Sequence, residues 1–177
     1  LFPNDFRAYN NLGEMAFAAG DVAKAESYFK QAAAKNANAP EVNANLGLCE
    51  LVKNNVAAAE TFLGKATGAN AANEALGNLY IKQGQYQRAV NAFGDAKTNS
   101  AAQAQILAKD YNKAKATLQA IANKDAMTDY LMAIVGARTN NASLVSSSIK
   151  SAIAKDPTLA AKAANDREFA KFASSLK

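Results

Sequence analysis

Residues 73–96 read NEALGNLYIKQGQYQRAVNAFGDA, and this stretch decides the expected fold. A Leu-Gly pair is followed by Gly84, and then Ala89, Phe93 and Ala96 follow at intervals of three or four residues. Such intervals place residues on one face of a helix. Gly84 falls between the two runs, where a residue with positive φ ends one helix before the next begins. The stretch therefore predicts two short helices that pack against each other.

The same order of residues occurs twice more, earlier in the chain. The three Leu-Gly pairs end at Gly13, Gly47 and Gly77, so they are spaced by 34 and 30 residues. The segments after the pairs match as well, and they read Gly20…Ala25…Phe29…Ala32, Asn54…Ala59…Leu63…Ala66 and Gly84…Ala89…Phe93…Ala96. Small residues on facing helices let two backbones approach closely, and Leu or Phe fills the space beside them. Helices this short are marginal alone, so repeated pairs are expected to stack on their neighbours.

The rest of the chain follows the pattern more loosely. A shortened helix without a Leu-Gly pair is expected around 101–109. Two further helices are predicted from about 126–138 and from about 143–154. Residues 159–164 and 166–176 are then expected to form one terminal helix or two short ones. Terminal units of stacked arrays depart from the repeat because they cap the exposed end of the core.

This arrangement resembles the tetratricopeptide repeat, a helix–turn–helix unit of about 34 residues. The resemblance covers residues 3–157 and is closest over the first 96. It implies an all-α fold, a right-handed superhelix of antiparallel helix pairs with a C-terminal capping helix. We expect a single domain over 1–177, with units at about 3–38, 39–69, 70–98, 99–124 and 125–157 and a cap at 158–177. The residues expected in the core include Leu12, Phe29, Leu76, Tyr80 and Phe93.

Composition argues against catalysis and against metal binding. The 177 residues contain no histidine and one cysteine. Without histidine there is no Ser-His-Asp or Cys-His catalysis, and the commonest metal ligand is missing. A single cysteine excludes an internal disulfide and a cysteine-built zinc site. We therefore expect no enzyme activity, no cofactor and no metal, and no apolar stretch is long enough to predict a transmembrane segment.

The resemblance also implies where a partner binds. In this family, ligands usually lie along the concave face that is lined by the first helix of each pair. Such a groove suits an extended or helical peptide of a partner protein, with a few apolar anchors and a polar rim. Residues spaced by three or four positions on one side of those helices, Phe17 among them, are expected to face the groove. The candidate partner-binding residues are Arg7, Asn10, Glu14, Asn45, Leu48, Glu74, Asn78 and Lys82.

Two other functions remain as alternatives. The array is alternatively a structural spacer or an oligomerisation surface, in which case its end helices matter more than its groove. Charge suggests a third possibility, because residues 97–177 carry 12 Lys and Arg against 6 Asp and Glu, whereas residues 1–96 carry 8 against 9. A basic half attracts nucleic acid phosphates. We rank nucleic-acid binding lower because this half lacks the interleaved aromatic residues that stack on single-stranded bases.

A finer resemblance concerns the two ends of the chain. The opening stretch, residues 2–13, and the stretch from Ala163 to Phe169 look like repeat domains in envelope proteins of Bacteroidetes-type bacteria. Some of those proteins attach the repeats to an OmpA-like, peptidoglycan-binding outer-membrane domain. This resemblance implies a bacterial periplasmic or outer-membrane-associated protein and a partner that is another envelope component. Because the chain begins at Leu1, we expect it to be part of a longer protein.

Overall fold

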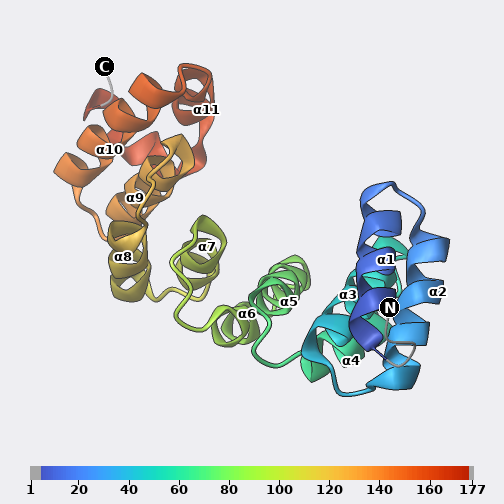
Figure 1. The fold of residues 1–177 in the computed structure, drawn as a ribbon. Helices are drawn as coiled ribbons and strands as arrows, with labels where there is room; N and C mark the ends of the chain where they lie inside the picture. Colours follow the sequence, from blue (N-terminus) through green and yellow to red (C-terminus); the bar gives the residue numbers. More distant parts are fainter. Residues whose placement is uncertain (1–4, 176–177) are drawn as a thin grey trace. The chain divides into compact units, whose positions relative to one another are not determined.

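A computed structural model describes residues 5–175 of the chain, and over that range regular structure is entirely helical (Figure 1). The expected all-α fold class is therefore confirmed. Residues 1–4, which carry the start of the opening stretch, and residues 176–177 lie outside the described range. The helices are α1 (Phe6–Ala18), α2 (Val22–Lys35), α3 (Pro40–Val52), α4 (Val56–Lys65), α5 (Asn70–Lys82), α6 (Tyr86–Phe93), α7 (Asn99–Leu107), α8 (Tyr111–Ala120), α9 (Ala126–Arg138), α10 (Ala142–Lys155), α11 (Leu159–Asn165) and the 3-10 helix η1 (Arg167–Ser175).

The turns inside the helix pairs share one backbone conformation. The second residue before the following helix has positive φ in each of them: Gly20 at 82°, Asn54 at 59°, Gly84 at 71°, Lys109 at 65° and Asn140 at 55°. Glycine takes this conformation without a steric cost, and asparagine tolerates it better than most residues. The expectation that glycines at 20 and 84 separate helices is confirmed.

A side-chain cap then starts the second helix in several of these pairs. The carboxylate of Asp21 accepts a hydrogen bond from the backbone N–H of Lys24, and the amide oxygen of Asn141 accepts one from Leu144, each at 3.0 Å. Such a cap satisfies one of the backbone donors that the first turn of a helix leaves free. The turns before α2 and α10 are thus specified by two consecutive residues, one for the backbone angle and one for the cap.

The chain divides into two compact units, one ending at Leu79 and the other beginning at Tyr80, so the division falls inside α5. We call them unit 1 and unit 2 and describe each by itself. In unit 1, α1 packs against α2, α2 against α3, and α3 against α4. In unit 2, contacts run from α6 to α7 and on through α8, α9 and α10 to α11 and η1. The single domain with five repeat units and a cap stays a prediction.

The close backbone approach predicted from small residues is present in unit 1. Ala25 and Ala59 are completely buried. A Cβ atom added to Gly47 would lie 2.6 Å from Cγ of Leu63, and one added to Gly13 would overlap the ring of Phe29. Real Cβ atoms do not come so close, so the first two Leu-Gly pairs place their glycines directly under the large residue of the second helix.

The expected core is confirmed at three of the five positions. Phe29, Tyr80 and Phe93 are buried, at 1%, 6% and 5% exposure. Leu76 is only partly buried, although it packs against the cluster of Ala44, Leu63, Ala66 and Ala72.

The prediction for Leu12 is wrong, because its side chain is 42% exposed. The physical reason lies in the neighbouring pair. Leu46, the equivalent residue of α3, is buried in the cluster that contains Ala25 and Phe29 of α2. In the described part of the chain α1 is the first helix, so no preceding pair covers Leu12 in the same way.

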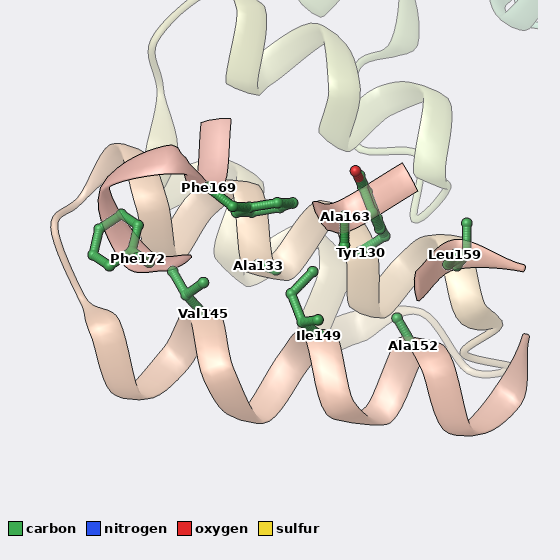
Figure 2. Packing of buried hydrophobic residues seen from close by; sticks show 9 residues of the cluster. All are labelled: Tyr130, Ala133, Val145, Ile149, Ala152, Leu159, Ala163, Phe169 and Phe172. Carbon is green, nitrogen blue, oxygen red and sulfur yellow. The ribbon is translucent and has the colours of Figure 1, made fainter. Parts of the chain in front are cut away.

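Two short helices, α11 and η1, close the described part of unit 2, which is one of the two alternatives that the sequence left open. Figure 2 shows Phe169 and Phe172 of η1 lying over α9 and α10, beside Tyr130, Val145 and Ile149. The rings of Tyr130 and Phe169 meet edge to face with centroids 5.5 Å apart. Such a pair contributes about 0.5–1.5 kcal/mol beyond the burial of its area. The cap is therefore part of the hydrophobic core of unit 2.

Polar contacts fasten the same cap to α9. The hydroxyl of Tyr130 donates to Oδ2 of Asp166 at 2.6 Å, and the guanidinium of Arg138 pairs with the carboxylate of Glu168 through both oxygens. Burial and the hydrogen bond to Asp166 raise the pKa of Tyr130 far above its ordinary value. The phenol thus stays protonated and keeps donating across the accessible pH range.

Candidate functional site

Unit 1 contains a pocket of about 190 Å³ at the place where α1, α2 and α3 meet. Two helices supply its walls at helical spacing, since Glu14, Phe17 and Ala18 come from α1 and Asn45 and Leu48 come from α3. Phe29 of α2 is the sixth lining residue. The pocket therefore forms on the first helices of two consecutive pairs, where the resemblance places a ligand.

A polar cluster at the edge of this pocket joins α1 to α3. The amide of Asn10 donates to Oε1 of Glu14 at 2.8 Å, and the amide of Asn45 donates to Oδ1 of Asn10 at 3.0 Å and to Oε1 of Glu14 at 3.1 Å. Asn10 is 5% exposed; it hydrogen-bonds within the cluster but does not line the pocket. Buried polar side chains need such partners because an unpaired one is costly.

These hydrogen bonds fix the carboxylate of Glu14 at the rim. The two that reach Glu14 both use Oε1, and no residue within the described range donates to Oε2. Oε2 is thus able to accept a hydrogen bond from a ligand or to pair with a cation. Glu14 is the one ionised side chain that lines this pocket.

The remaining walls of the pocket are apolar and offer a place for one large side chain. Phe17 and Leu48 are half-buried, and Phe29 is buried. Cavities of about 150 Å³ with aliphatic and aromatic linings accept a molecule as large as benzene. Burying a Leu- or Phe-sized side chain in such surroundings contributes about 1.5–3 kcal/mol. The site suits an apolar anchor that is flanked by a hydrogen-bond donor or a cation.

The other predicted groove residues are placed differently. Arg7 is exposed near the start of α1, with its guanidinium 5.7 Å from the ring centroid of Phe6, and it does not line the pocket. Glu74, Asn78 and Lys82 follow one another at intervals of four along α5, so they share one helix face. Glu74 and Lys82 are exposed and Asn78 is partly buried. These four residues stay predicted partner contacts.

Sequence reasoning missed two of the lining residues. Phe29 was expected only as a core residue, yet its ring both covers Gly13 and lines the pocket. Ala18 lies one helical turn after Glu14, and that spacing was the signal that could have identified it. The partnership between Glu14 and Asn45, which are 31 residues apart, carries no local signal at all.

The single cysteine does not add chemistry to this site. Cys49 is completely buried in α3, and burial is the main cause that raises the pKa of its thiol to about 11. The reactive thiolate is therefore scarce at neutral pH. Beside it, the ammonium of Lys53 links Glu26 of α2 to Glu50 of α3, at 2.9 and 2.6 Å. These ion pairs and Cys49 hold α2 and α3 together.

Neither metal coordination nor membrane crossing has support in the part of the chain that the structure describes. Residues 5–175 contain no group of three or more Cys, Asp or Glu side chains arranged to hold a metal ion. No helix in that range is both long enough and apolar enough to span a bilayer.

Comparison with known proteins gives the family context of the N-terminal half. The sequence matches two models of the tetratricopeptide repeat, one over residues 16–80 and one over residues 72–101. No protein with a curated description matches the sequence significantly.

Solved structures agree over nearly the whole chain. A tetratricopeptide repeat protein from Parabacteroides merdae is similar with a TM-score of 0.73 and 16% identity, over 97% of this chain and 73% of that one. MamA from Desulfovibrio magneticus, from residue 41 to its end, gives a TM-score of 0.70 and 15% identity over 89% and 98% of the two chains. PilW, described as a widely conserved type IV pilus biogenesis factor, gives 0.63 and 20% over 99% and 84%. At these identities the likeness concerns the fold, which is that of helical repeat proteins.

Proposed function

Because residues 16–101 match tetratricopeptide repeats, which generally serve as protein–protein interaction modules, we propose that this chain is a non-catalytic module that binds a peptide segment of a partner protein in the pocket between α1 and α3. The proposal rests on one observation: an apolar pocket is lined by the carboxylate of Glu14, whose Oε1 is hydrogen-bonded within the protein and whose Oε2 is able to accept from a ligand. Four predicted residues meet there: Asn10, Glu14, Asn45 and Leu48.

The charge of this pocket defines the partner more closely. Glu14 presents Oε2 beside apolar walls, and the cluster with Asn10 and Asn45 keeps the carboxylate from turning away. A partner segment with a large apolar side chain next to a lysine or arginine fills the pocket and pairs with Glu14. Unit 1 as a whole supports this preference, because residues 1–79 carry 8 Asp and Glu against 6 Lys and Arg.

Four further residues are proposed as partner contacts. Arg7 on α1, and Glu74, Asn78 and Lys82 on α5, are polar side chains on the first helices of their pairs. Polar residues around an apolar anchor set the register and specificity of a peptide more than its affinity. We assign Arg7, Glu74 and Asn78 to the rim of the binding surface of unit 1, whereas Lys82 lies in unit 2 and is a separate proposed contact.

A pair of substitutions on α3 tests the proposal. Leu48→Arg fills the pocket with a charged side chain, whereas Val52→Arg places the same charge on the same helix, at a residue that is 60% exposed and does not line the pocket. Each protein is used as bait for cross-linking capture and quantitative mass spectrometry of cell extracts. A partner bound by wild type and by Val52→Arg, but lost with Leu48→Arg, is the expected result.

The controls separate binding from folding. Both variants are required to keep the helical circular dichroism of the wild type. Photo-cross-linkers placed at residue 18 and at residue 52 then report whether the captured protein touches the pocket or the far end of α3. Equal capture by all three proteins, or cross-links from residue 52 alone, contradicts the pocket as the binding site.

One observation favours a second candidate function, self-association through the first helix. Leu12 and Met15, three residues apart on α1, are 42% and 70% exposed. Neighbouring apolar side chains on an exposed face are typical of interaction surfaces. Sedimentation of wild type and of a Leu12→Ser/Met15→Ser variant decides this alternative. A dimer that the substitutions dissociate supports an oligomerisation array, and a monomer in both cases removes it.

We also propose that the chain belongs to a larger bacterial envelope protein, in the periplasm or at the outer membrane. The support is the resemblance of its opening and ending stretches to repeat domains of Bacteroidetes-type envelope proteins. Fractionation of the source cells with an antibody against the purified chain tests this proposal. Recovery with the envelope fractions is expected, and recovery with the cytoplasmic fraction alone rejects it.

A further inference from the structure

Unit 2 contains a second pocket that the proposed function does not use. It has a volume of about 410 Å³ and lies where α7, α9 and α11 meet. Met127, Leu131 and Ile134 of α9 form its apolar part. Met127 is 38% exposed although it is a large apolar side chain, so part of this surface is open to solvent.

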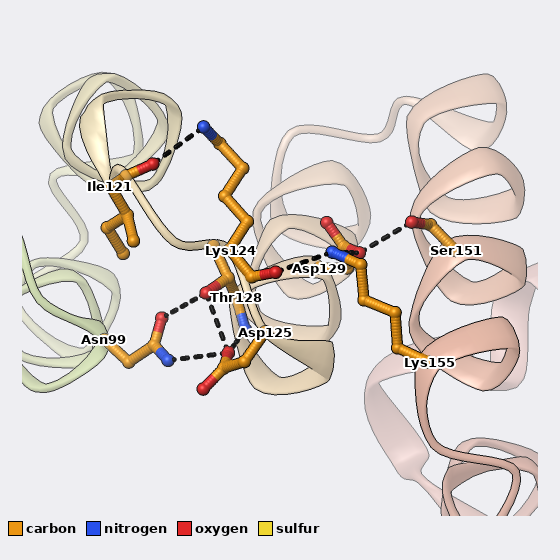
Figure 3. A network of polar contacts seen from close by, with 8 residues as sticks. All are labelled: Asn99, Ile121, Lys124, Asp125, Thr128, Asp129, Ser151 and Lys155. Carbon is orange, nitrogen blue, oxygen red and sulfur yellow. Dashed lines mark hydrogen bonds and ion pairs between the residues drawn. The ribbon is translucent and has the colours of Figure 1, made fainter.

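Several polar groups around this pocket are already committed to the fold. Asp166 accepts from the hydroxyl of Tyr130 through Oδ2 and from the backbone N–H of Glu168 through Oδ1. Figure 3 shows that the amide of Asn99 donates to Asp125 and accepts from the hydroxyl of Thr128, both at 3.0 Å. These groups hold α7, α9 and η1 in place, so their role in the pocket is structural.

Three other polar side chains of the pocket remain available to bind a ligand. Lys162 projects its ammonium over the ring of Tyr130, 4.8 Å from the centroid, and no carboxylate of the described residues forms an ion pair with it. The side chains of Ser100 and Gln103 make no hydrogen bond within residues 5–175, and both line the pocket. The free ionised group of this site is therefore a cation, held in place by an aromatic ring.

The charge of the whole unit has the same sign. Residues 80–177 carry 14 Lys and Arg against 7 Asp and Glu. Excess charge of one sign attracts segments of the opposite sign and steers their approach. The apolar part of the pocket requires an apolar side chain, and Lys162 requires an anionic neighbour.

We propose that this pocket is a second peptide-binding site, which takes a partner segment with a large apolar side chain flanked by acidic residues. The apolar side chain lies against Met127, Leu131 and Ile134, and a flanking carboxylate pairs with Lys162. Gln103 and Ser100 hydrogen-bond the peptide backbone. This site belongs to unit 2, so it does not depend on the pocket between α1 and α3.

Methionine methyl groups make the test specific. The chain has three methionines, of which Met127 lines the pocket, and Met15 is 70% exposed on α1 in unit 1. The 177-residue chain labelled with [methyl-¹³C]methionine is titrated with the blocked peptide Gly-Ser-Asp-Leu-Asp-Ser-Gly. The Met127 resonance is expected to shift with saturation, while the Met15 resonance stays in place.

Matched peptides and variants identify the contacts. Replacing Leu by Ala in the peptide should weaken binding about tenfold, because the apolar anchor is lost. Lys162→Gln should weaken it about two- to fivefold, the range of an exposed charge pair, and should abolish most of its salt dependence. Lys150→Gln makes the same charge change at an exposed residue of α10 outside the pocket, and it should leave the affinity unchanged.

Four outcomes overturn the proposal. In the first, the Met127 resonance does not respond to the acidic peptide, and in the second, a peptide with Lys in place of both Asp binds equally well. In the third, Lys162→Gln and Lys150→Gln weaken binding equally. In the fourth, Met127 shifts with dodecathymidine but not with the peptide. The last outcome assigns the pocket to nucleic acid. None of them bears on capture through Leu48, so failure here is distinguishable from failure of the proposed function.

Discussion

In unit 1, the pocket between α1 and α3 has Phe17, Phe29 and Leu48 as its apolar walls and Glu14 as its ionised group. In unit 2, the pocket beside α9 has Met127, Leu131 and Ile134 as its apolar part and Lys162 as its free ionised group. Both pockets involve the first helices of neighbouring pairs, yet their charges are opposite.

The difference indicates which positions of a repeat are free to set the selectivity of the two proposed binding sites. Positions that face the neighbouring helix are apolar or small because packing requires it, and they recur along the chain. Positions at the rim carry no such requirement, so they are free to differ in charge. In unit 2 the cation comes from α11, a short helix that has no counterpart among residues 5–79.

The largest expected effect is the loss of stability when a buried aromatic ring is removed from the core of either unit. Phe29→Ala and Phe169→Ala each remove a buried aromatic ring and should lower the free energy of unfolding of their own unit by about 3–5 kcal/mol. Cys49 reports unit 1 selectively, because it is buried there and is the only cysteine of the chain. Its rate of alkylation under native conditions is the measurement.

Phe29→Ala should accelerate that alkylation by at least about a hundredfold, since 2.7 kcal/mol corresponds to about a factor of 100. Phe169→Ala should leave the rate nearly unchanged while it lowers the helical signal of unit 2 on heating. Equal acceleration of alkylation by both variants contradicts separate unfolding of the two units.

Two glycines of unit 1 test whether close packing limits the size of the residue at each position. Gly47→Ala should destabilise the protein by about 1–3 kcal/mol, because the added methyl overlaps Leu63. Gly64→Ala should be neutral or stabilising by up to about 1 kcal/mol, because a Cβ atom there meets nothing within 4 Å and alanine favours the helix. Urea unfolding of both variants gives the two changes, and a shift of the same sign for both argues against close packing at Gly47.

A smaller effect compares helix caps between the units. Asp125 caps α9 and accepts from the backbone and hydroxyl of Thr128 and from Asn99, whereas Asp21 caps α2 through Lys24 alone. Loss of a cap costs about 1 kcal/mol, and Asp125→Ala should exceed Asp21→Ala because more donors lose their acceptor. Urea unfolding at pH 7 measures both.

The effect of Asp125 also depends on pH in a defined direction. Hydrogen bonds, first of all from the backbone of Thr128, lower the pKa of this carboxyl below its ordinary value. The stabilisation is therefore fully present above the unfolded pKa of about 3.9 and is lost as pH falls through the lower pKa of the folded protein. The difference between wild type and Asp125→Ala should shrink below about pH 4. A difference that grows on acidification contradicts the assignment.

The smallest expected effect concerns the ion pair of the cap. Arg138→Gln breaks the contact with Glu168, but the Arg138 side chain is 45% exposed, so the loss should stay below about 1 kcal/mol and shrink in high salt. Thermal unfolding at low and high ionic strength checks this. A larger, salt-independent loss means that the cap depends on its polar contacts more than on Phe169 and Phe172.

Features that recur in the sequence were predictable, and features that depend on a neighbour were not. The close packing at Gly13 and Gly47, the turn at Gly20 and the buried Phe29 follow from spacing alone, and the structure confirms them. Leu12 occupies the same motif position as Leu46, but its exposure depends on whether another pair covers it.

The pockets required more than the repeat pattern. Asn10, Glu14, Asn45 and Leu48 were identified as one surface, but their hydrogen bonds join residues up to 35 positions apart and had no local signal. The pocket of unit 2 was not predicted, because its cation, Lys162, comes from the short α11 and lies over Tyr130 of α9, 32 positions earlier in the chain. A motif defined within each helix pair does not determine how an irregular cap folds back.

The most direct test of two pockets with opposite charge is one NMR experiment on the full chain with labelled Met, Leu and Ala methyl groups. Two blocked peptides are titrated separately, Gly-Ser-Lys-Leu-Lys-Ser-Gly and Gly-Ser-Asp-Leu-Asp-Ser-Gly. The basic peptide is predicted to shift Ala18 and Leu48, which line the pocket of unit 1, and the acidic peptide to shift Met127 in unit 2. Shifts of the same methyl groups by both peptides, or of none by either, would contradict the account.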